Sequence, residues 1–473
     1  MSTAVQAPPT SPAETPTAEP RGTLQTGLGP LLRRLHFYAG ILVAPFLLAL
    51  AVTGLAYAFS PQVDQIAYHD QLYVDTVGTT AVPLSQQVAA ARAAVPDGTL
   101  VAVHPAAAPD ATTKVEFALP ELGDKQRTAY IDPYTGRLRG ILTTWFGATS
   151  ATTWLDQMHS NLNLGEPGRV YSELAASWLW VLVLGGLILW WRHHHARRTA
   201  RRLLLPDTAA RAGVRRTRSW HATTGLWAAA VLLFLSATGL TWSQYAGANF
   251  GWLRGTLNSD SVALNLSLDN ATAPPDEHSH HGGTTGGGAA DFDAIAASAA
   301  AVNLTGPLTI TPGEQGRAWT VEQVDNVWPV HRDKIAVHPL TGQVVDTVAW
   351  DRQPLLSKLT TFGIQAHMGV LFGLANQLAL AAVALALIAV IGRGYRMWWR
   401  RRPTRARWKL GSPPQRGTWR LPRPAATAAV VAAAAAVGFA IPLLGLSLLA
   451  FLLVDLAAGA VARLRPTRSG AGG

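Results

Sequence analysis

Two apolar runs of membrane length begin in the same way, and they constrain the fold more than any other feature. One run starts at Leu35 and ends near Phe59, and the other starts at Trp220 and ends near Trp242. About 20 residues are needed to cross the hydrocarbon core of a bilayer, so both runs predict transmembrane helices. The matched positions are His36, Gly40 and Thr53-Gly54 in the first run, and His221, Gly225 and Thr238-Gly239 in the second.

A histidine at a membrane edge is ordinarily a hydrogen-bonded interfacial residue. Its recurrence in two runs with the same neighbours favours a functional role, because ionisable side chains inside spans are costly. Two more histidines extend the match. His159 precedes the second apolar run and is followed by Gly165, and His367 precedes the fourth run and is followed by Gly373 at the same offset. The chain therefore consists of two copies of one unit in the same orientation, a parallel repeat.

Composition agrees with a polytopic membrane protein. Of 473 residues, 49% are hydrophobic and 14% are charged, whereas soluble proteins average about 25% charged residues. The net charge of +11 comes from basic residues clustered beside apolar runs, where they act as topology signals, so no nucleic-acid partner is expected. Cysteine is absent, which excludes disulfides, thiolate metal sites and covalent haem attachment.

Arginine clusters predict the orientation. Arg33 and Arg34 precede the first run, and further clusters follow the second run within 192–218 and the fourth run within 393–402. By the positive-inside rule these segments are cytoplasmic, as are both termini, and the protein crosses a bacterial cell membrane several times. Pro45 is expected to kink the first span.

This orientation divides the chain into membrane spans, external segments and cytoplasmic segments. The expected segments are a disordered tail (1–28), a first span (29–59), an external domain (60–170), a second span (171–191), a basic loop (192–218), a third span (219–244), a second external domain (245–366), a fourth span (367–399), a basic segment (400–424), an apolar hairpin (425–461) and a tail (462–473).

The two external segments have the same pattern of elements, which predicts two α+β domains. In the first, a helix over 83–95 precedes strand-like runs and the turn Asp132–Gly136; in the second, a helix over 292–302 precedes similar runs and the turn His338–Gly342. The expected strands are Leu100–Val103, Val115–Leu119 and Thr128–Ile131, then Leu308–Thr311, Trp319–Val321 and Ile335–Val337.

Topology sorts the four histidines by depth. His36 and His221 lie near the cytoplasmic face, and His159 and His367 lie near the outer face. Two opposed neutral imidazoles are the axial ligands of a b-type haem, so the pattern predicts two haems stacked across the bilayer as an electron path. Structural histidines, another metal or a proton relay remain alternatives, although a non-haem metal usually takes three or four ligands and a relay needs intervening carboxylates.

These motifs, over about Leu31 to Arg402, resemble the PepSY-associated transmembrane family. The resemblance implies that the external segments are PepSY-like domains. It also implies iron-uptake chemistry, because members of the family include haem-containing reductases of ferric siderophores. The sequence has no Walker loop and no flavin or nicotinamide fingerprint, so the electron donor is expected to be a separate protein or a membrane quinol. The rival hypothesis is a non-redox PepSY regulatory or metal-handling protein.

Other candidates have weaker support. His278, His280 and His281 lie in a Gly-rich stretch that either binds a divalent metal or is a flexible loop tip. The run His193–His195 is expected to be solvated or lipid-facing, and His331 and His338 to be surface residues or part of a substrate surface. In the apolar hairpin, hinged near Pro442, Asp455 is expected to pair with Arg463 or another arginine rather than act in catalysis. One long tilted helix is the alternative to the hairpin.

Overall fold

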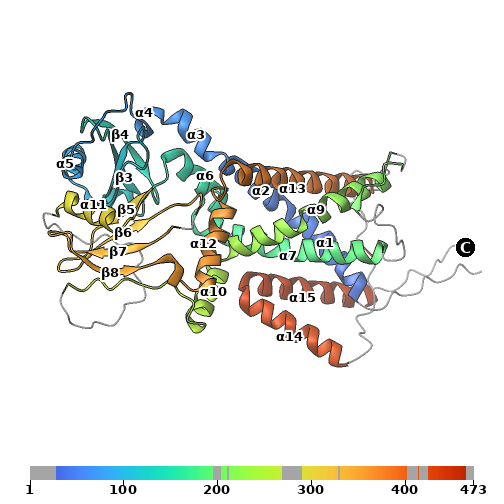
Figure 1. The fold of residues 1–473 in the computed structure, drawn as a ribbon. Coiled ribbons are helices and arrows are strands. Elements are labelled where there is room, and N and C mark those ends of the chain that lie inside the picture. Colours follow the sequence, from blue (N-terminus) through green and yellow to red (C-terminus); the bar gives the residue numbers. More distant parts are fainter. Residues whose placement is uncertain are drawn as a thin grey trace, which may run out of the picture.

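The computed structural model describes residues 28–194, 204–209, 212–268, 290–328, 331–401, 414 and 424–464. A bundle of long helices occupies one half of the molecule and a β-sheet with two helices the other half (Figure 1). Outside the described residues lie 1–27 of the expected tail, 195–203 and 210–211 of the first basic segment, and most of the second basic segment, 400–424. The bundle helices are α1 (Leu28–Leu42), α2 (Ala44–Ala58), α7 (Glu166–His194), α9 (Val214–Leu240), α13 (Leu374–Arg400), α14 (Pro424–Ala440) and α15 (Pro442–Leu464).

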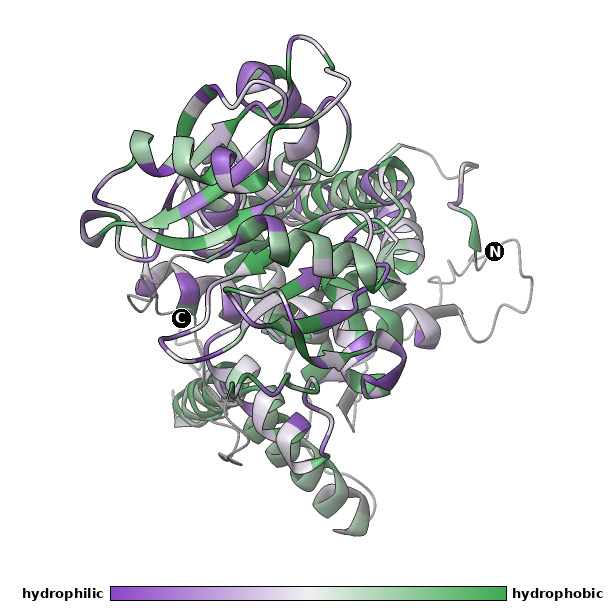
Figure 2. Ribbon diagram, turned by 60° about the vertical axis from the view of Figure 1, so that its left-hand side comes forward, coloured by the Kyte–Doolittle hydropathy of each residue, from purple (hydrophilic) through white to green (hydrophobic). Residues whose placement is uncertain are grey.

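The bundle helices have the length and hydropathy of membrane spans. Within the described residues, four are long and apolar enough to cross a bilayer, namely α7, α9, α13 and α15, and the bent pair α1–α2 adds a fifth. Most residues of these spans are not buried against other parts of the protein, so their apolar side chains are left for lipid. Hydrophilic residues are instead spread over the sheet (Figure 2). The protein is a polytopic membrane protein.

The first span is bent by 57° where α1 passes into α2. Pro45 stands in the first turn of α2, directly after the break at Val43. A proline has no N–H to donate and its ring collides with the carbonyl one turn earlier, so the helix cannot continue straight. The kink expected from Pro45 is confirmed.

The strands form one antiparallel sheet of eight strands in the order β4-β3-β2-β1-β5-β6-β7-β8. The sequence predicts two separate domains, but β1 and β5 pair at Val103 and Ile310 and join both halves into one sheet. Helices α5 (Leu84–Ala94) and α11 (Phe292–Ala301) pack on the sheet over a single apolar core that includes Phe117 and Ile335. The strands are β1 (Thr99–His104), β2 (Thr113–Ala118), β3 (Gln126–Ile131), β4 (Leu138–Thr144), β5 (Leu308–Thr311), β6 (Trp319–Gln323), β7 (Lys334–Val337) and β8 (Val344–Val348).

The outermost strands β4 and β8 are not among the expected strands. Each follows one of the expected turns, in which Gly136 and Gly342 adopt positive φ values that favour glycine. Each strand is also at an edge of the sheet, where nearly all of its residues are half-buried or exposed, and so lacks the buried apolar runs from which the inner strands were predicted.

Short helices connect the sheet to the bundle (Figure 1). The carboxylate of Glu173, buried in α7, accepts hydrogen bonds from the backbone N–H groups of Tyr245 and Ala246 at the start of α10, at 3.0 and 2.9 Å. A carboxylate at a helix N-terminus satisfies donors that have no partner within the helix. The connecting helices are α3 (Ser60–Ala67), α4 (His69–Leu72), α6 (Ser150–Asn161), α10 (Tyr245–Thr256) and α12 (Leu355–His367), with 3-10 turns at Pro120–Leu122 and Trp350–Arg352.

At the C-terminus, α14 and α15 form a hairpin rather than one long helix. The two helices approach closely at Gly438 and Gly445, where a Cβ on Gly445 would lie 2.6 Å from the Cα of Gly438. Asp455 of α15 pairs with Arg34 of α1, and both side chains are buried. The expectation that an arginine neutralises Asp455 is therefore met, by a residue of the first span.

This ion pair predicts a stability effect. Replacing Asp455 with Ala removes the carboxylate beside the buried Arg34 guanidinium, which typically costs about 3 kcal/mol or more. We expect Asp455→Ala to lower the thermal unfolding midpoint in detergent. Replacing both residues with leucine should restore most of the stability, and an unchanged midpoint in Asp455→Ala would show that the pair does not hold the hairpin.

Candidate functional site

The structure brings His36 and His221 together, one from each half of the repeat. Their ring centres are 6.4 Å apart and the ring planes are 86° apart. Nδ1 of His36 lies 3.1 Å from the carbonyl oxygen of Leu182, and Nδ1 of His221 lies 2.9 Å from that of Val390. We call this the inner pair, because it lies in the bundle away from the sheet.

His159 of α6 and His367 of α12 form a second pair, the outer pair, on the side of the sheet. Their ring centres are 6.3 Å apart and the planes are 58° apart. Nδ1 of His159 lies 3.0 Å from the hydroxyl of Thr53, and Nδ1 of His367 lies 2.8 Å from that of Thr238. These threonines belong to the Thr-Gly pairs that mark the sequence repeat.

The partners of Nδ1 determine the tautomer of all four rings. A backbone carbonyl can only accept, so Nδ1 of each inner histidine must donate. The hydroxyl of Thr53 donates to the carbonyl of Ala49 at 2.8 Å, and that of Thr238 to Phe234 at 2.9 Å. Each hydroxyl oxygen is thereby left as an acceptor for an outer histidine. The proton of every ring is on Nδ1, and the lone pair of Nε2 remains for a metal.

Glycines make room for the rings. A Cβ on Gly54 would lie 3.0 Å from Cε1 of His159, and one on Gly239 would lie 3.2 Å from Cε1 of His367. At the inner pair, a Cβ on Gly186 would lie 3.2 Å from Cε1 of His36. Gly394 takes the same position beside His221, at 3.7 Å. A Cβ at Gly54, Gly186 or Gly239 would therefore press against the imidazole, whereas one at Gly394 would make an ordinary van der Waals contact.

Gly40 and Gly225 have a different environment. Each lies one turn after an inner histidine and therefore on the same helix face. A Cβ on either glycine would meet no heavy atom within 4 Å. Space is therefore open next to the inner pair. Gly165 and Gly373, also part of the sequence repeat, have positive φ values in the turns that precede α7 and α13.

Four contributors to the site were not predicted from the sequence. They are the carbonyls of Leu182 and Val390 and the glycines Gly186 and Gly394. Leu182 follows His159 at the same offset as Val390 follows His367, and the two glycines each stand four residues further on. Extending the repeat alignment through the second and fourth spans would have revealed the two glycines.

The arrangement offers two imidazole nitrogens at each level. Among the residues that the structure describes, no three histidines, cysteines or carboxylates are grouped to hold a metal ion. His221 and Thr238 stand about 17 residues apart on the unbroken helix α9, which at 1.5 Å per residue separates the two levels by about 25 Å.

The sequence pattern of the PepSY-associated TM region matches residues 33–401, which include all four histidines and both halves of the repeat. The chain belongs to this family. No curated protein matches the chain. In this PepSY-associated protein the matched region ends at residue 401, so the C-terminal hairpin lies outside the family pattern.

Of the other histidine candidates, His278, His280 and His281 lie outside the described residues. Nδ1 of His338 accepts long hydrogen bonds from the backbone N–H groups of Leu340 and Thr341, both at 3.3 Å, and so stabilises its own turn. This is a local structural role for His338.

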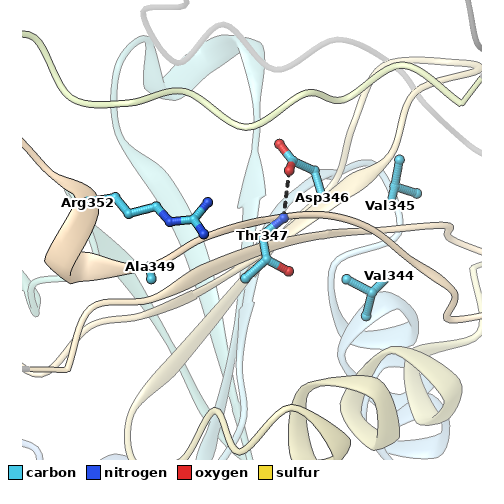
Figure 3. A pocket seen from close by; sticks show the side chains of 6 residues that line it. All are labelled: Val344, Val345, Asp346, Thr347, Ala349 and Arg352. Atoms are coloured by element: carbon cyan, nitrogen blue, oxygen red, sulfur yellow. Dashed lines mark hydrogen bonds between the residues drawn. The ribbon is translucent and has the colours of Figure 1, made fainter.

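A pocket of about 420 Å³ opens beside β8 at the edge of the sheet (Figure 3). It is lined by Val344, Val345, Asp346, Thr347, Ala349 and Arg352. The side chains of Asp346 and Arg352 give it one acidic and one basic group, but none of the four repeat histidines takes part in it.

The threonine contacts can be tested directly. In Thr53→Val the Nδ1 proton of His159 loses its acceptor, so we expect the ¹⁵N solid-state NMR signals of that ring to move while those of the inner histidines do not. Thr53→Ser should keep the wild-type signals, since it retains the hydroxyl. Thr256→Val is the matched control, because Thr256 also bonds to its own helix but contacts no histidine. Unchanged His159 signals in Thr53→Val would contradict the assigned tautomer.

Proposed function

We propose that this protein is a membrane cytochrome of the b type that carries electrons across the bilayer. In this proposal His36 with His221 would hold one haem through their Nε2 atoms, and His159 with His367 would hold a second. The observation that carries the proposal is the pairing of imidazoles across the repeat, with every Nδ1 occupied by a hydrogen bond and every Nε2 available.

The residues present fit such a group. An imidazole nitrogen binds a metal at about 2 Å, so two rings on opposite sides of one metal have centres roughly 6 Å apart. Both pairs have this separation, at 6.4 and 6.3 Å. The open space beside Gly40 and Gly225 supplies room for a macrocycle at the inner level. Haem, when bound, supplies a one-electron redox change without a change of ligands.

The chain's own residues hold and tune the two levels. The hydrogen bond from each Nδ1–H fixes the ring orientation and increases the basicity of Nε2. The apolar helices keep water out, which together with the neutral imidazole ligands influences the redox potential. The unbroken span α9 carries His221 at one end and Thr238, which orients His367, at the other, so one rigid element sets the distance between both levels.

The acceptor is proposed to be an extracytoplasmic ferric chelate such as a siderophore. The family resemblance supports this substrate class, and the eight-stranded sheet next to the outer pair offers a surface on which an acceptor could dock. Reduction of Fe(III) to the softer Fe(II) weakens binding by hard oxygen ligands and so favours release of iron. The donor would be a quinol or a reductant on the cytoplasmic side.

The proposed location is a bacterial cell membrane, with the sheet as a pair of fused PepSY-like domains outside and both termini inside. The arginine clusters beside the spans support this orientation. A reporter enzyme that is active only outside the cytoplasm should work when fused near Gly123, in the sheet, and fail when fused at Arg218. The opposite pattern would reverse the orientation.

Single histidine variants test the pairing. His36→Ala and His221→Ala should both lose the inner haem and keep the outer one, whereas His159→Ala and His367→Ala should lose the outer haem. Haem content and reduced-minus-oxidised spectra of the purified proteins would show this. All four variants should lose reduction of an external ferric chelate, since either loss interrupts the path.

The control is His338→Ala, which should keep both haems, because His338 only stabilises a turn. If His36→Ala and His159→Ala removed the same haem, the pairing would run within each half instead. A well-folded protein without haem, expressed with ample haem, would favour the non-redox regulatory alternative.

A further inference from the structure

Around the outer pair, the two halves of the repeat differ in their acidic residues. In the first half, Asp156 stands one turn before His159 on α6, and Tyr57 stands one turn after Thr53 on α2. In the second half the equivalent positions hold Ile364 and Trp242. The threonine, glycine and histidine that form the pair are present in both halves, so the acidic residue is not needed to build it.

The charges of Asp64 of α3 and of Asp156 both act on Tyr57 of α2, so the two carboxylates lie in the same region. The carboxylate of Asp64 accepts hydrogen bonds from the hydroxyls of Thr149 at 2.5 Å and Thr152 at 2.8 Å, both at the start of α6. Thr152 stands one turn before Asp156 on the same helix face. In the second half Asn249 takes the place of Asp64, since each is the fifth residue of its helix, α10 and α3. The side-chain amide of Asn249 donates instead to the backbone carbonyl of Phe439 in α14.

Beyond Asp64 the polar groups continue into the sheet. The charges of Asp64 and Glu116 both act on Lys114 of β2, whose pKa is lowered by burial. Glu116 accepts from Nε2 of His104 at 3.0 Å, and the His104 side chain is 20% exposed. A series of titratable side chains thus extends from Asp156 to the surface of the sheet.

Asp156 is not neutralised by a partner. In the described parts of the chain, no group hydrogen-bonds or ion-pairs with it, and it is half-buried. The helices and strand packed against α6 carry few other titratable groups, and the cations among these are engaged elsewhere. They are Tyr57 of α2, Asp64 of α3 and Arg139 of β4, which binds Asp75. Near its start, α7 adds Glu166 paired with Arg169, Tyr171 packed on Phe46, and Glu173, which accepts from the backbone of α10.

A half-buried carboxyl without a cation partner is poised to change protonation when a nearby charge changes. Burial raises the pKa of Asp156 to about 6 and raises the pKa of Asp64 against the opposing effect of its two threonine donors. Asp156 can therefore exchange a proton close to neutral pH, whereas Ile364 in the other half cannot.

We propose that Asp156, supplied through Asp64, delivers a proton to the outer level whenever an electron arrives there. This inference rests on the proposed electron path. Only the first half of the repeat carries this proton route. The acceptor is then a ferric chelate whose oxyanion donors are protonated as the metal is released.

When an electron arrives at the outer level, Asp156 takes up a proton from Asp64, which is recharged from solvent on the side of Lys114 and His104. One electron, from the quinol or cytoplasmic reductant, then reduces the Fe(III) of the chelate to Fe(II). The bond between the metal and one oxyanion donor breaks, and the proton held by Asp156 goes to that oxygen and gives a neutral hydroxyl.

The test is a redox titration of the purified holoprotein at several pH values. Above pH 6 the carboxyl of Asp156 is ionised in the oxidised state and takes up a proton on reduction. The midpoint potential of the outer haem should then fall as pH rises, by at most 59 mV per pH unit for one electron and one proton. Asp156→Asn should lose most of this slope, while the midpoint potential of the inner haem should stay as in the wild type.

Two variants complete the test. Asp156→Glu keeps a carboxyl and should keep the slope, and Asp70→Asn, a change of an exposed carboxylate on α4, should also leave it unaltered. In redox-induced infrared difference spectra, a protonated carboxyl band should appear in the wild type and be missing in Asp156→Asn.

The outcomes separate the two proposals. Wild-type protein without haem would overturn both. Protein with two haems and an equal slope in wild type and Asp156→Asn would overturn the proton route and leave the electron path standing.

Discussion

The hydrogen bond from each histidine Nδ1 to its own half of the repeat is the interaction on which the rest of the site depends. His36 bonds to Leu182 and His159 to Thr53, all in the first half, and the second half repeats this arrangement. Each half therefore supplies the hydrogen bonds that orient its own two rings. Each ring pair forms between the halves, so packing of the two halves completes both pairs.

Packing of α9 against both α7 and α13 therefore has a functional consequence. A shift of one turn along the helices, about 5.4 Å, would separate both ring pairs. The joined sheet at β1–β5 adds a second connection between the halves, outside the spans. The Arg34–Asp455 pair secures the hairpin to the helix that carries His36. Several independent contacts thus fix the register that the histidine pairs require.

Much of the site could be predicted from the sequence because duplication reveals it. Repeated offsets and the arginine pattern were enough to sort four histidines into two depths. The function of Thr53-Gly54 was not predictable, because its partner His159 lies 106 residues away and only the folded chain shows that the hydroxyl and the ring meet. Backbone carbonyls such as that of Leu182 leave no signal in residue identity.

Predictions were weakest for the sheet and the hairpin contacts. Edge strands β4 and β8 carry little apolar pattern, and the single pair Val103–Ile310 that fuses two expected domains has no sequence signature. Asp455 was expected to find an arginine, but nothing in the sequence distinguishes Arg34 from others. Local rules describe elements well, whereas contacts between distant elements depend on the packing of the whole chain.

Electron paramagnetic resonance of the oxidised, purified protein tests the central claim most directly. The inner imidazole planes are 86° apart and the outer ones 58° apart, so two bis-histidine haems should differ in electronic anisotropy. The account predicts two distinct low-spin ferric signals of equal intensity, with the more anisotropic one missing in His221→Ala. A well-folded protein with haem but only high-spin iron, or with no iron signal after expression with ample haem, would contradict it.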